Sequence, residues 1–296
     1  MTDPAVERDA AESASAFSHP PVEPDATRAY GEHPDQVVDF YAPRGDAPPG
    51  ATLGPAPLVV VLHGGAWRAP YDRRHITPLA DFLARKGFAV ANVEYRRGGS
   101  LPHQGGDGPV AGRWPETFDD VAAAMDALPR LAAEALPQAD VRRTVVTGHS
   151  AGGHLALWAA ARHVLPAGSP WRPATPPPLR GVVALAPIAD FTVAEELGVC
   201  GGASAQLLGG ERYWDERLPY ADPAALLPTG IATAVVQGRD DIVVPEEVAE
   251  AYVAAAAKAG ELVGLTLLDG VGHFPLIDPA ADACAVVAEE ISQLAW

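Results

Sequence analysis

A single serine stands among glycines in Gly148-His149-Ser150-Ala151-Gly152, between an apolar run and an alanine-rich run. The spacing Gly-x-Ser-x-Gly is typical of a sharp turn from a strand into a helix, on which the serine takes a strained backbone conformation. Residues two positions away on either side must be small, which explains both glycines. Such a turn would present Ser150 as a nucleophile. A glycine-rich turn with a capping serine would use the same residues, so the pattern needs support from elsewhere in the chain.

A serine hydroxyl is a weak nucleophile at neutral pH unless an imidazole takes its proton and a carboxylate orients that imidazole. After a strand–serine–helix turn of this kind, the acid and then the histidine follow along the chain. His273 follows the last apolar run, whereas His154 and His163 lie in the helical run behind the serine. Asp240 and Asp241 follow the preceding apolar run. We choose His273 as the base and Asp241 as the acid, with Asp240 as the alternative.

Hydrogen-bond donors for an oxyanion are expected in Val61–Trp67, where two glycines follow an apolar run. Glycines let a backbone pass close to a ligand and turn its amides inward. One such donor typically stabilises a transition state by about 2.7–4 kcal/mol. His63 is expected to orient this loop through hydrogen bonds and not to carry a proton. The expected donors are the backbone amides of Gly64, Gly65, Ala66 and Ala151.

Apolar runs alternate with helical patterns along most of the chain, which predicts a mostly parallel sheet with helices on both faces. An insertion over Phe191–Gly230, after the strand that ends near Pro187, would suit a lid or a substrate wall. Strands are expected over Gln36–Tyr41, Leu58–His63, Phe88–Tyr95, Thr144–Gly148, Gly181–Pro187, Ala232–Gly238 and Gly264–Gly270. Helices are expected over His75–Lys86, Glu116–Leu128, Ala151–His163, Pro245–Ala259 and Pro279–Leu294, the last capped by Asp278.

The first 29 residues differ in composition from the rest of the chain. They are rich in Ala, Ser, Pro, Asp and Glu, and their larger apolar residues are Val6, Phe17 and Val22. A segment that buries so little apolar surface does not offset the entropy lost on ordering. We therefore expect residues 1–29 to be a disordered tail and residues 30–296 to form a single catalytic domain.

Composition and charge exclude several classes of function. The formal charge of −17, from 21 basic and 38 acidic residues, argues against partners such as nucleic acids and anionic membranes. We find neither an apolar run of membrane-spanning length nor a secretory signal. The two cysteines lack metal-type spacing, and the glycine-rich stretch 96–114 lacks a phosphate-binding pattern. We expect a cytoplasmic protein without metal or organic cofactor, and we leave the oligomeric state open, with a homodimer as one candidate.

Several segments resemble those of a known family. They include "HGGAW", "NVEYRR", "GHSAGG", "GRDDIVVP" and "GHFPLIDP", and together such segments span about residues 30–279. The chain resembles the α/β-hydrolase superfamily, and more narrowly the serine esterases that include kynurenine formamidases (arylformamidases) and related carboxylesterases. The form HGG-x-W of the oxyanion loop is the feature shared with the formamidases. The resemblance implies a triad of Ser150, Asp241 and His273, without a metal.

Three functions compete at this point. The first is a carboxylesterase that cleaves small or aryl esters through an acyl-enzyme, and the second is an arylformamidase that hydrolyses N-formylkynurenine. Both would use the same triad and would differ in the shape of the pocket and in the leaving group. The third is a binding protein on a hydrolase scaffold that has lost catalysis, which the presence of both the serine and the histidine disfavours.

Overall fold

A single mixed sheet forms the centre of the computed structural model, which describes residues 3–45, 55–98, 111–112 and 114–296. The strand order is β1-β2-β4-β3-β5-β6-β7-β8. Strands β3 to β8 are mutually parallel, while β1 and β2 are antiparallel to their neighbours. The described strands are β1 (Ala26–Ala29), β2 (Val37–Tyr41), β3 (Ala56–Leu62), β4 (Ala89–Val93), β5 (Ala139–His149), β6 (Leu179–Leu185), β7 (Thr233–Gly238) and β8 (Val263–Leu268).

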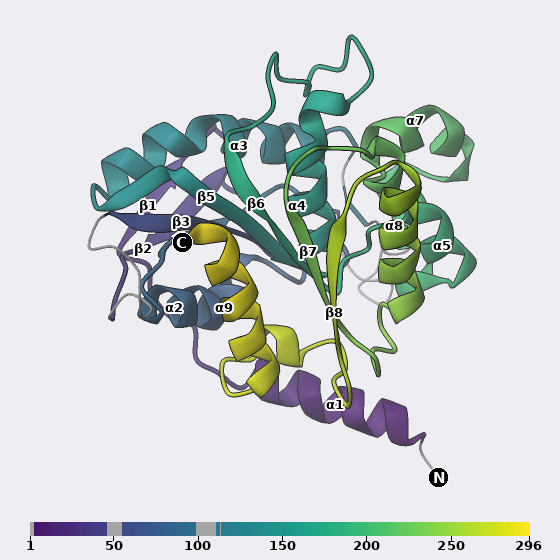
Figure 1. Ribbon diagram of the computed structural model, residues 1–296, viewed down its shortest axis with the longest axis horizontal. Coiled ribbons are helices and arrows are strands. Elements are labelled where there is room, and N and C mark those ends of the chain that lie inside the picture. Colours follow the sequence, from purple (N-terminus) through teal and green to yellow (C-terminus); the bar gives the residue numbers. More distant parts are fainter. Residues whose placement is uncertain (1–2, 46–54, 99–110, 113) are drawn as a thin grey trace.

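Helices cover both faces of this sheet (Figure 1). One face carries α3 (Glu116–Ala135), α4 (Ala151–Ala161) and α8 (Glu246–Lys258), and the other carries α2 (Thr77–Arg85) and α9 (Asp282–Ala295). The expected parallel α/β architecture is therefore confirmed. The expected helix over Glu116–Leu128 continues seven residues further, because Pro129 lies inside α3 without ending it.

The middle strand β3 shows why these strands are apolar throughout. Successive side chains of a strand point to opposite faces of the sheet. Leu58, Val60 and Leu62 belong to the core cluster under α3, α4 and α8. Val59 and Val61 belong to the cluster under α2 and α9. Both faces are buried, so a pattern of alternating polar residues is absent from β3.

The expectation of a disordered segment at residues 1–29 is wrong for residues 3–29, which the structure describes. The structure places helix α1 (Pro4–Ala16) and strand β1 in this segment. The side chain of Asp3 caps α1 by accepting a hydrogen bond from the amide of Ala5 at 2.9 Å. Of the residues of α1, only Ala16 is buried. The helix is therefore held mainly by polar contacts with distant parts of the chain, which the composition of the segment does not reveal.

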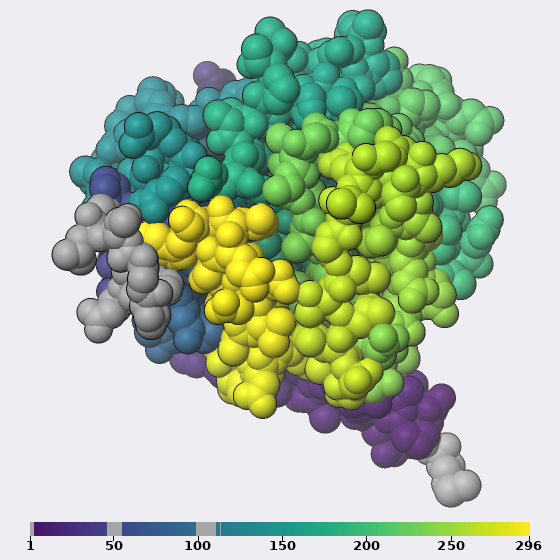
Figure 2. All heavy atoms as spheres, in the orientation of Figure 1, coloured from purple at the N-terminus to yellow at the C-terminus, as the bar shows by residue number. Residues whose placement is uncertain are grey.

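The segment between α1 and β1 is also fixed by distant residues. Asp278, which was expected to cap the last helix, accepts a hydrogen bond from Ser15, near the end of α1, at 2.5 Å and faces the imidazole of His19, after α1, at 2.7 Å. Its carboxylate also accepts from the amide of Ala280 at 2.9 Å. Helix α9 begins four residues after Asp278, at Asp282. Helix α1 packs against the short helix η6 (Pro275–Ile277) and runs along the lower side of the molecule (Figures 1 and 2).

The insertion expected over Phe191–Gly230 is present beside α8 (Figure 1). It contains α5 (Phe191–Glu196), α6 (Ala203–Leu207), α7 (Trp214–Ala221) and short 3-10 turns. The glycine-rich stretch expected to form a loop over 96–114 lies largely outside the described residues. Strands β3, β5, β7 and β8 all end at one edge of the sheet, so the loops that follow them meet there.

Candidate active site

Ser150 occupies a strained turn between β5 and α4. Its φ of 58° and ψ of −119° lie outside the regions that a non-glycine residue normally adopts. A Cβ atom on Gly148 would collide with the carbonyl oxygen of Gly152, and one on Gly152 would collide with that of Leu62. Both glycines are therefore required by close backbone contacts, as the sequence predicts. Strain of this kind typically costs about 1–3 kcal/mol and is concentrated at functional sites.

His273 and Asp241 form a buried pair at the same edge of the sheet. His273 Nδ1 lies 2.6 Å from Asp241 Oδ2, and both side chains are almost fully buried. The other carboxylate oxygen of Asp241 accepts hydrogen bonds from the amides of Val243 and Val244, both at 2.8 Å. Because Nδ1 faces a carboxylate, this nitrogen carries the proton and Nε2 is left as the proton acceptor.

The neighbouring Asp240 has a different environment. Its carboxylate forms an ion pair with Arg8 of α1, with 3.2 Å between Nη1 and Oδ2, and about a third of its side chain is exposed. The carboxylate of Asp241, in contrast, contacts His273 directly. Of the two candidates, the geometry therefore selects Asp241.

Ser150 and His273 line one cavity of about 200 Å³. The side chain of Ser150 makes no hydrogen bond within the described part of the chain, so its hydroxyl and the imidazole share the cavity without being bonded to each other. Catalytic hydrogen bonds often tighten only when substrate is bound. The lining residues are Phe17, Gly65, Ala66, Arg68, Tyr71, His75, His149, Ser150, Cys200, Val243, His273, Phe274 and Ile277.

The loop after β3 supplies amides beside Ser150. Gly65, Ala66 and Trp67 have φ values of 102°, 51° and 55°, so three successive residues are left-handed. Gly65 and Ala66 line the cavity, and a Cβ atom on Gly64 would lie 2.7 Å from the carbonyl oxygen of His149. The loop thus lies directly against the serine turn. We call residues 63–68 the oxyanion loop.

The amides of Gly64, Gly65, Ala66 and Ala151 donate no hydrogen bond within the described part of the chain. Ala151 is the first residue of α4, so its amide has no partner inside the helix. Amides without partners next to a nucleophile are available to bind an oxyanion. The structure thus brings together every residue chosen from the sequence for the triad and the oxyanion hole.

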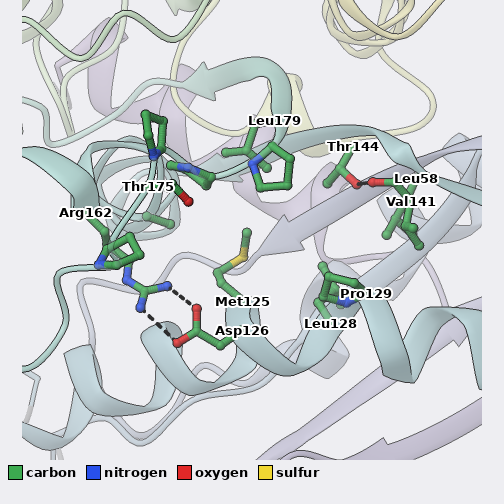
Figure 3. A pocket seen from close by; sticks show the side chains of 15 residues that line it. Leu58, Met125, Asp126, Leu128, Pro129, Val141, Thr144, Arg162, Thr175 and Leu179 are labelled. Atoms are coloured by element: carbon green, nitrogen blue, oxygen red, sulfur yellow. Dashed lines mark hydrogen bonds and ion pairs between the residues drawn. The ribbon is translucent and has the colours of Figure 1, made fainter.

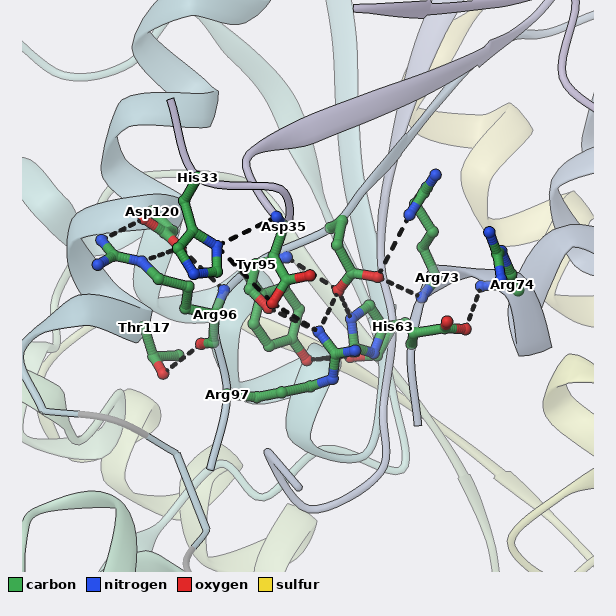
Figure 4. A network of polar contacts seen from close by, with 12 residues as sticks. His33, Asp35, His63, Arg73, Arg74, Tyr95, Arg96, Arg97, Thr117 and Asp120 are labelled. Atoms are coloured by element: carbon green, nitrogen blue, oxygen red, sulfur yellow. Dashed lines mark hydrogen bonds and ion pairs between the residues drawn. The ribbon is translucent and has the colours of Figure 1, made fainter. Parts of the chain in front are cut away.

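A network of charged and polar side chains lies beneath the oxyanion loop (Figure 4). His63 Nε2 lies 2.8 Å from Glu94 Oε1, and His63 Nδ1 lies 2.9 Å from the carbonyl oxygen of Gly64. Tyr95 stacks on His63 with 4.3 Å between ring centroids, and its hydroxyl donates to the carbonyl oxygen of His63 at 2.6 Å. These contacts fix the start of the loop, as expected for an orienting residue.

Glu94 is the centre of this network. It accepts hydrogen bonds from Arg97 Nη1 at 2.7 Å and from the amide of Arg73 at 3.0 Å, in addition to its contact with His63. Burial alone would raise the pKa of Glu94, but the charge and hydrogen bond of His63 and the charge of Arg97 outweigh it and lower the pKa to about 2. No local sequence pattern identifies Glu94, because its importance depends on a contact with His63, 31 positions earlier.

Two further histidines lie at the cavity and were not assigned a role from the sequence. His149 Nε2 lies 2.9 Å from the carbonyl oxygen of His273, so it holds the backbone of the candidate base. Burial, followed by the nearby His273, lowers the pKa of His149 well below its usual value. Burial and the nearby His63 lower the pKa of His75 to about 4. Both rings are therefore uncharged near neutral pH.

Helix α1 contacts the loops that carry the acid and the base. Glu12 accepts a hydrogen bond from the amide of Gly272 at 3.1 Å, next to His273. Arg8 donates to the carbonyl oxygen of Asp240 at 3.2 Å, next to Asp241. Phe17, just after the helix, lines the cavity and packs edge-on against Phe274 at 5.4 Å. More than 230 residues separate the partners of each hydrogen bond, so no local pattern predicts them.

A second cavity, of about 220 Å³, lies away from Ser150, under the proline-rich segment 173–179 (Figure 3). Its charged lining residues are Arg162 and Asp126, which are joined by two hydrogen bonds of 2.8 and 3.0 Å.

Among the described residues, no group of three or more His, Cys, Asp or Glu side chains is placed to hold a metal ion. None of the described helices is long and apolar enough to cross a membrane.

Solved structures with this fold include several esterases. Esterase B of Lactobacillus rhamnosis is 18% identical, with 98% of this chain and 93% of that chain covered and a TM-score of 0.70. Esterase 2 of Thermogutta terrifontis, phosphoramylated by tabun, is 19% identical, with 90% and 92% covered and a TM-score of 0.64.

A bifunctional GH43-CE protein of Bacteroides eggerthii is 22% identical, with a TM-score of 0.70. The match covers 92% of this chain but only 38% of that larger protein. No curated protein matches the sequence. The BD-FAE family matches residues 38–255, which is well over half of the chain and includes Ser150 and Asp241. The chain, with its α/β-hydrolase fold, therefore belongs to the BD-FAE family.

Proposed function

We propose that this protein is a serine hydrolase that cleaves small or aryl carboxylic esters through an acyl-enzyme. The observation that carries the proposal is that Ser150, on a strained backbone, lines the same cavity as His273. His273 is in turn paired with the buried Asp241. A non-glycine residue held at such a φ and ψ needs a reason, and presentation of a nucleophile supplies one.

The proposed reaction follows from the positions of these groups. His273 Nε2 accepts the proton of the Ser150 hydroxyl as the oxygen attacks the carbonyl carbon of the ester. The amides of Gly65, Ala66 and Ala151, with Gly64 as a further donor, stabilise the oxyanion. His273 then donates its proton to the leaving alcohol. A water molecule, deprotonated by the same imidazole, releases the acid and frees the serine.

Hydrolysis of an aryl formamide such as N-formylkynurenine is the alternative activity. The observation that favours it is the aromatic lining of the cavity by Phe17, Tyr71 and Phe274, which suits an aryl group. The same triad would serve both reactions. Comparing kcat/KM for p-nitrophenyl acetate and N-formylkynurenine decides between them, and a strong preference for the formamide would reverse our order.

The proposed mechanism is tested by exchange of Ser150 for alanine. We expect kcat for p-nitrophenyl acetate to fall about 10⁶-fold, as for other serine triads. A fluorophosphonate probe should label the wild-type protein and should fail to label Ser150→Ala. Equal hydrolysis by both proteins would refute the mechanism. Absence of labelling and of hydrolysis in the wild-type protein would favour a binding protein that has lost catalysis.

A further inference from the structure

The cavity beside Ser150 contains one permanently charged side chain, Arg68, among its described lining residues. No aspartate or glutamate belongs to this lining. His75 and His149 also line the cavity, but burial lowers the pKa of both, so neither adds a charge near neutral pH. Arg68 therefore supplies the positive charge of this lining.

Hydrogen bonds hold Arg68 in place between two elements of the site. Its amide donates to the carbonyl oxygen of Gly65 at 3.0 Å, which closes the turn of the oxyanion loop. Its Nη2 donates to the carbonyl oxygen of Cys200 at 2.7 Å, in the insertion after β6. Nε is buried without a partner, and Nη1 has no partner within the described part of the chain. A guanidinium has five N–H donors, so most of the donors of Arg68 are unused.

Other arginines near cavities and loops have carboxylate partners. Arg162 in the second cavity makes two hydrogen bonds to Asp126 (Figure 3). Beneath the oxyanion loop, Arg97 pairs with Glu94, and Arg96 pairs with Asp120 (Figure 4). These arginines have a structural role. Arg68 pairs with no carboxylate among the described residues, although the chain contains 38 acidic residues.

We infer that Arg68 forms a carboxylate subsite, so that the preferred substrates carry a carboxylate near the bond that is cleaved. This inference rests on the proposed hydrolase function and names its class of substrate. A planar guanidinium with free donors binds a carboxylate through charge-assisted hydrogen bonds. The net charge of −17 repels anions from the molecule as a whole, so recognition of an anion requires a local cation of this kind.

The test compares esters that carry a free carboxylate with the corresponding neutral methyl esters. One pair is mono-4-nitrophenyl succinate and its neutral methyl ester, which places the carboxylate in the acyl group. The other pair is 3-acetoxybenzoate and methyl 3-acetoxybenzoate, which places it in the leaving group. The readout is the ratio of kcat/KM for the anionic and neutral member of each pair. We expect wild-type protein to favour the anionic member at least tenfold in one pair.

Three variants test whether Arg68 causes this preference for anionic esters. In Arg68→Gln the ratio should fall about 10- to 100-fold, as for loss of a hydrogen bond to a charged group, and the change should appear mainly in KM. In Arg68→Lys, which keeps the charge without the planar fork, part of the preference should remain. The matched control is Arg74→Gln, an exposed arginine outside the cavity lining, which should leave the ratio unchanged. Circular dichroism and urea unfolding establish that each variant is folded.

The outcomes separate this inference from the proposed function. If wild-type protein hydrolyses the neutral esters but shows no anionic preference in either pair, the subsite is refuted and the hydrolase stands. The same holds if a folded Arg68→Gln variant keeps the wild-type ratio. If wild-type protein hydrolyses none of the four esters and a fluorophosphonate does not label Ser150, the proposed function fails, and the inference fails with it.

Discussion

The two sides of the serine turn are held in place in different ways. On one side, the oxyanion loop rests on buried charges with Glu94 at their centre, whose partners include Arg97 three residues later and His63, 31 positions earlier in the chain. On the other side, Asp241 and His273 are fixed by backbone amides and by each other, and helix α1 holds their loops from outside.

This difference has consequences for stability and for activity. A buried carboxylate with charged partners cannot lose them without a large cost to the fold. A surface helix with a single buried residue can lose a contact while the sheet stays intact. Damage to the first side should therefore appear in the free energy of unfolding, and damage to the second side should appear in turnover.

The largest effect on turnover is expected at the acid. In Asp241→Asn, the amide no longer stabilises the imidazolium or fixes the tautomer of His273, so kcat should fall about 10⁴-fold. The matched control is Asp240→Asn, which changes the neighbouring carboxylate that pairs with Arg8. Its kcat should stay within about threefold of wild type, because an exposed ion pair contributes little. If the two variants lose activity equally, the assignment of the acid is wrong.

A large effect on stability is expected at Glu94. In Glu94→Gln, His63 and the guanidinium of Arg97 lose their shared carboxylate, and the free energy of unfolding in urea at pH 7 should fall by about 3 kcal/mol. In Glu246→Gln, which removes a more exposed ion pair with Arg239, the fall should stay below about 1 kcal/mol.

The pH dependence of this loss follows from the lowered pKa of Glu94. Because the pKa in the fold is about 2, below the usual 4.5, the ionised carboxylate stabilises the fold above pH 4.5. That contribution is lost as the pH falls from 4.5 through 2. The difference between wild type and Glu94→Gln should shrink over the same interval. A difference that is independent of pH would contradict the role of the charge.

A smaller effect is expected where α1 contacts the loop of the base. Glu12→Ala removes the hydrogen bond to the amide of Gly272, and we expect kcat to fall about 3- to 10-fold. The free energy of unfolding should change by less than about 1.5 kcal/mol. Glu7→Ala, an exposed glutamate on the same helix, serves as the control. If it slows turnover as much as Glu12→Ala, general loosening of the helix explains the effect and the contact does not.

The smallest effect is expected at Phe17, which follows α1 and lines the cavity beside Ser150. Phe17→Ala enlarges the cavity, so the ratio of kcat/KM for p-nitrophenyl hexanoate and acetate should rise about threefold. Val6→Ala shortens an exposed apolar side chain of α1 that does not line the cavity, and its ratio should match that of wild type. An unchanged ratio in Phe17→Ala would show that this side chain does not limit the acyl group.

The sequence predicts the elements whose formation depends on local patterns. The seven predicted strands correspond to β2 to β8. In β3 and β4, burial on both faces leaves an almost continuous apolar signal. Ser150, its flanking glycines and the oxyanion loop are also predictable, because close backbone contacts restrict residue types over a few positions. His273 and Asp241 follow from the order of the chain once the serine turn is recognised.

The missed features depend on contacts between distant residues. Helix α1 buries little of its own surface and relies on Asp240, Gly272 and Asp278, so its composition resembles that of an unfolded segment. The absence of a partner for Arg68 is equally hidden, because every arginine looks the same in a sequence. Only the spatial arrangement shows which charges have partners and which are available.

Because Phe17 and Glu12 belong to one short stretch at the start of the chain, the dimensions of the cavity and the support of the base are encoded together, far from the serine. An exchange of these first residues between related proteins would transplant both properties at once and leave the sheet untouched.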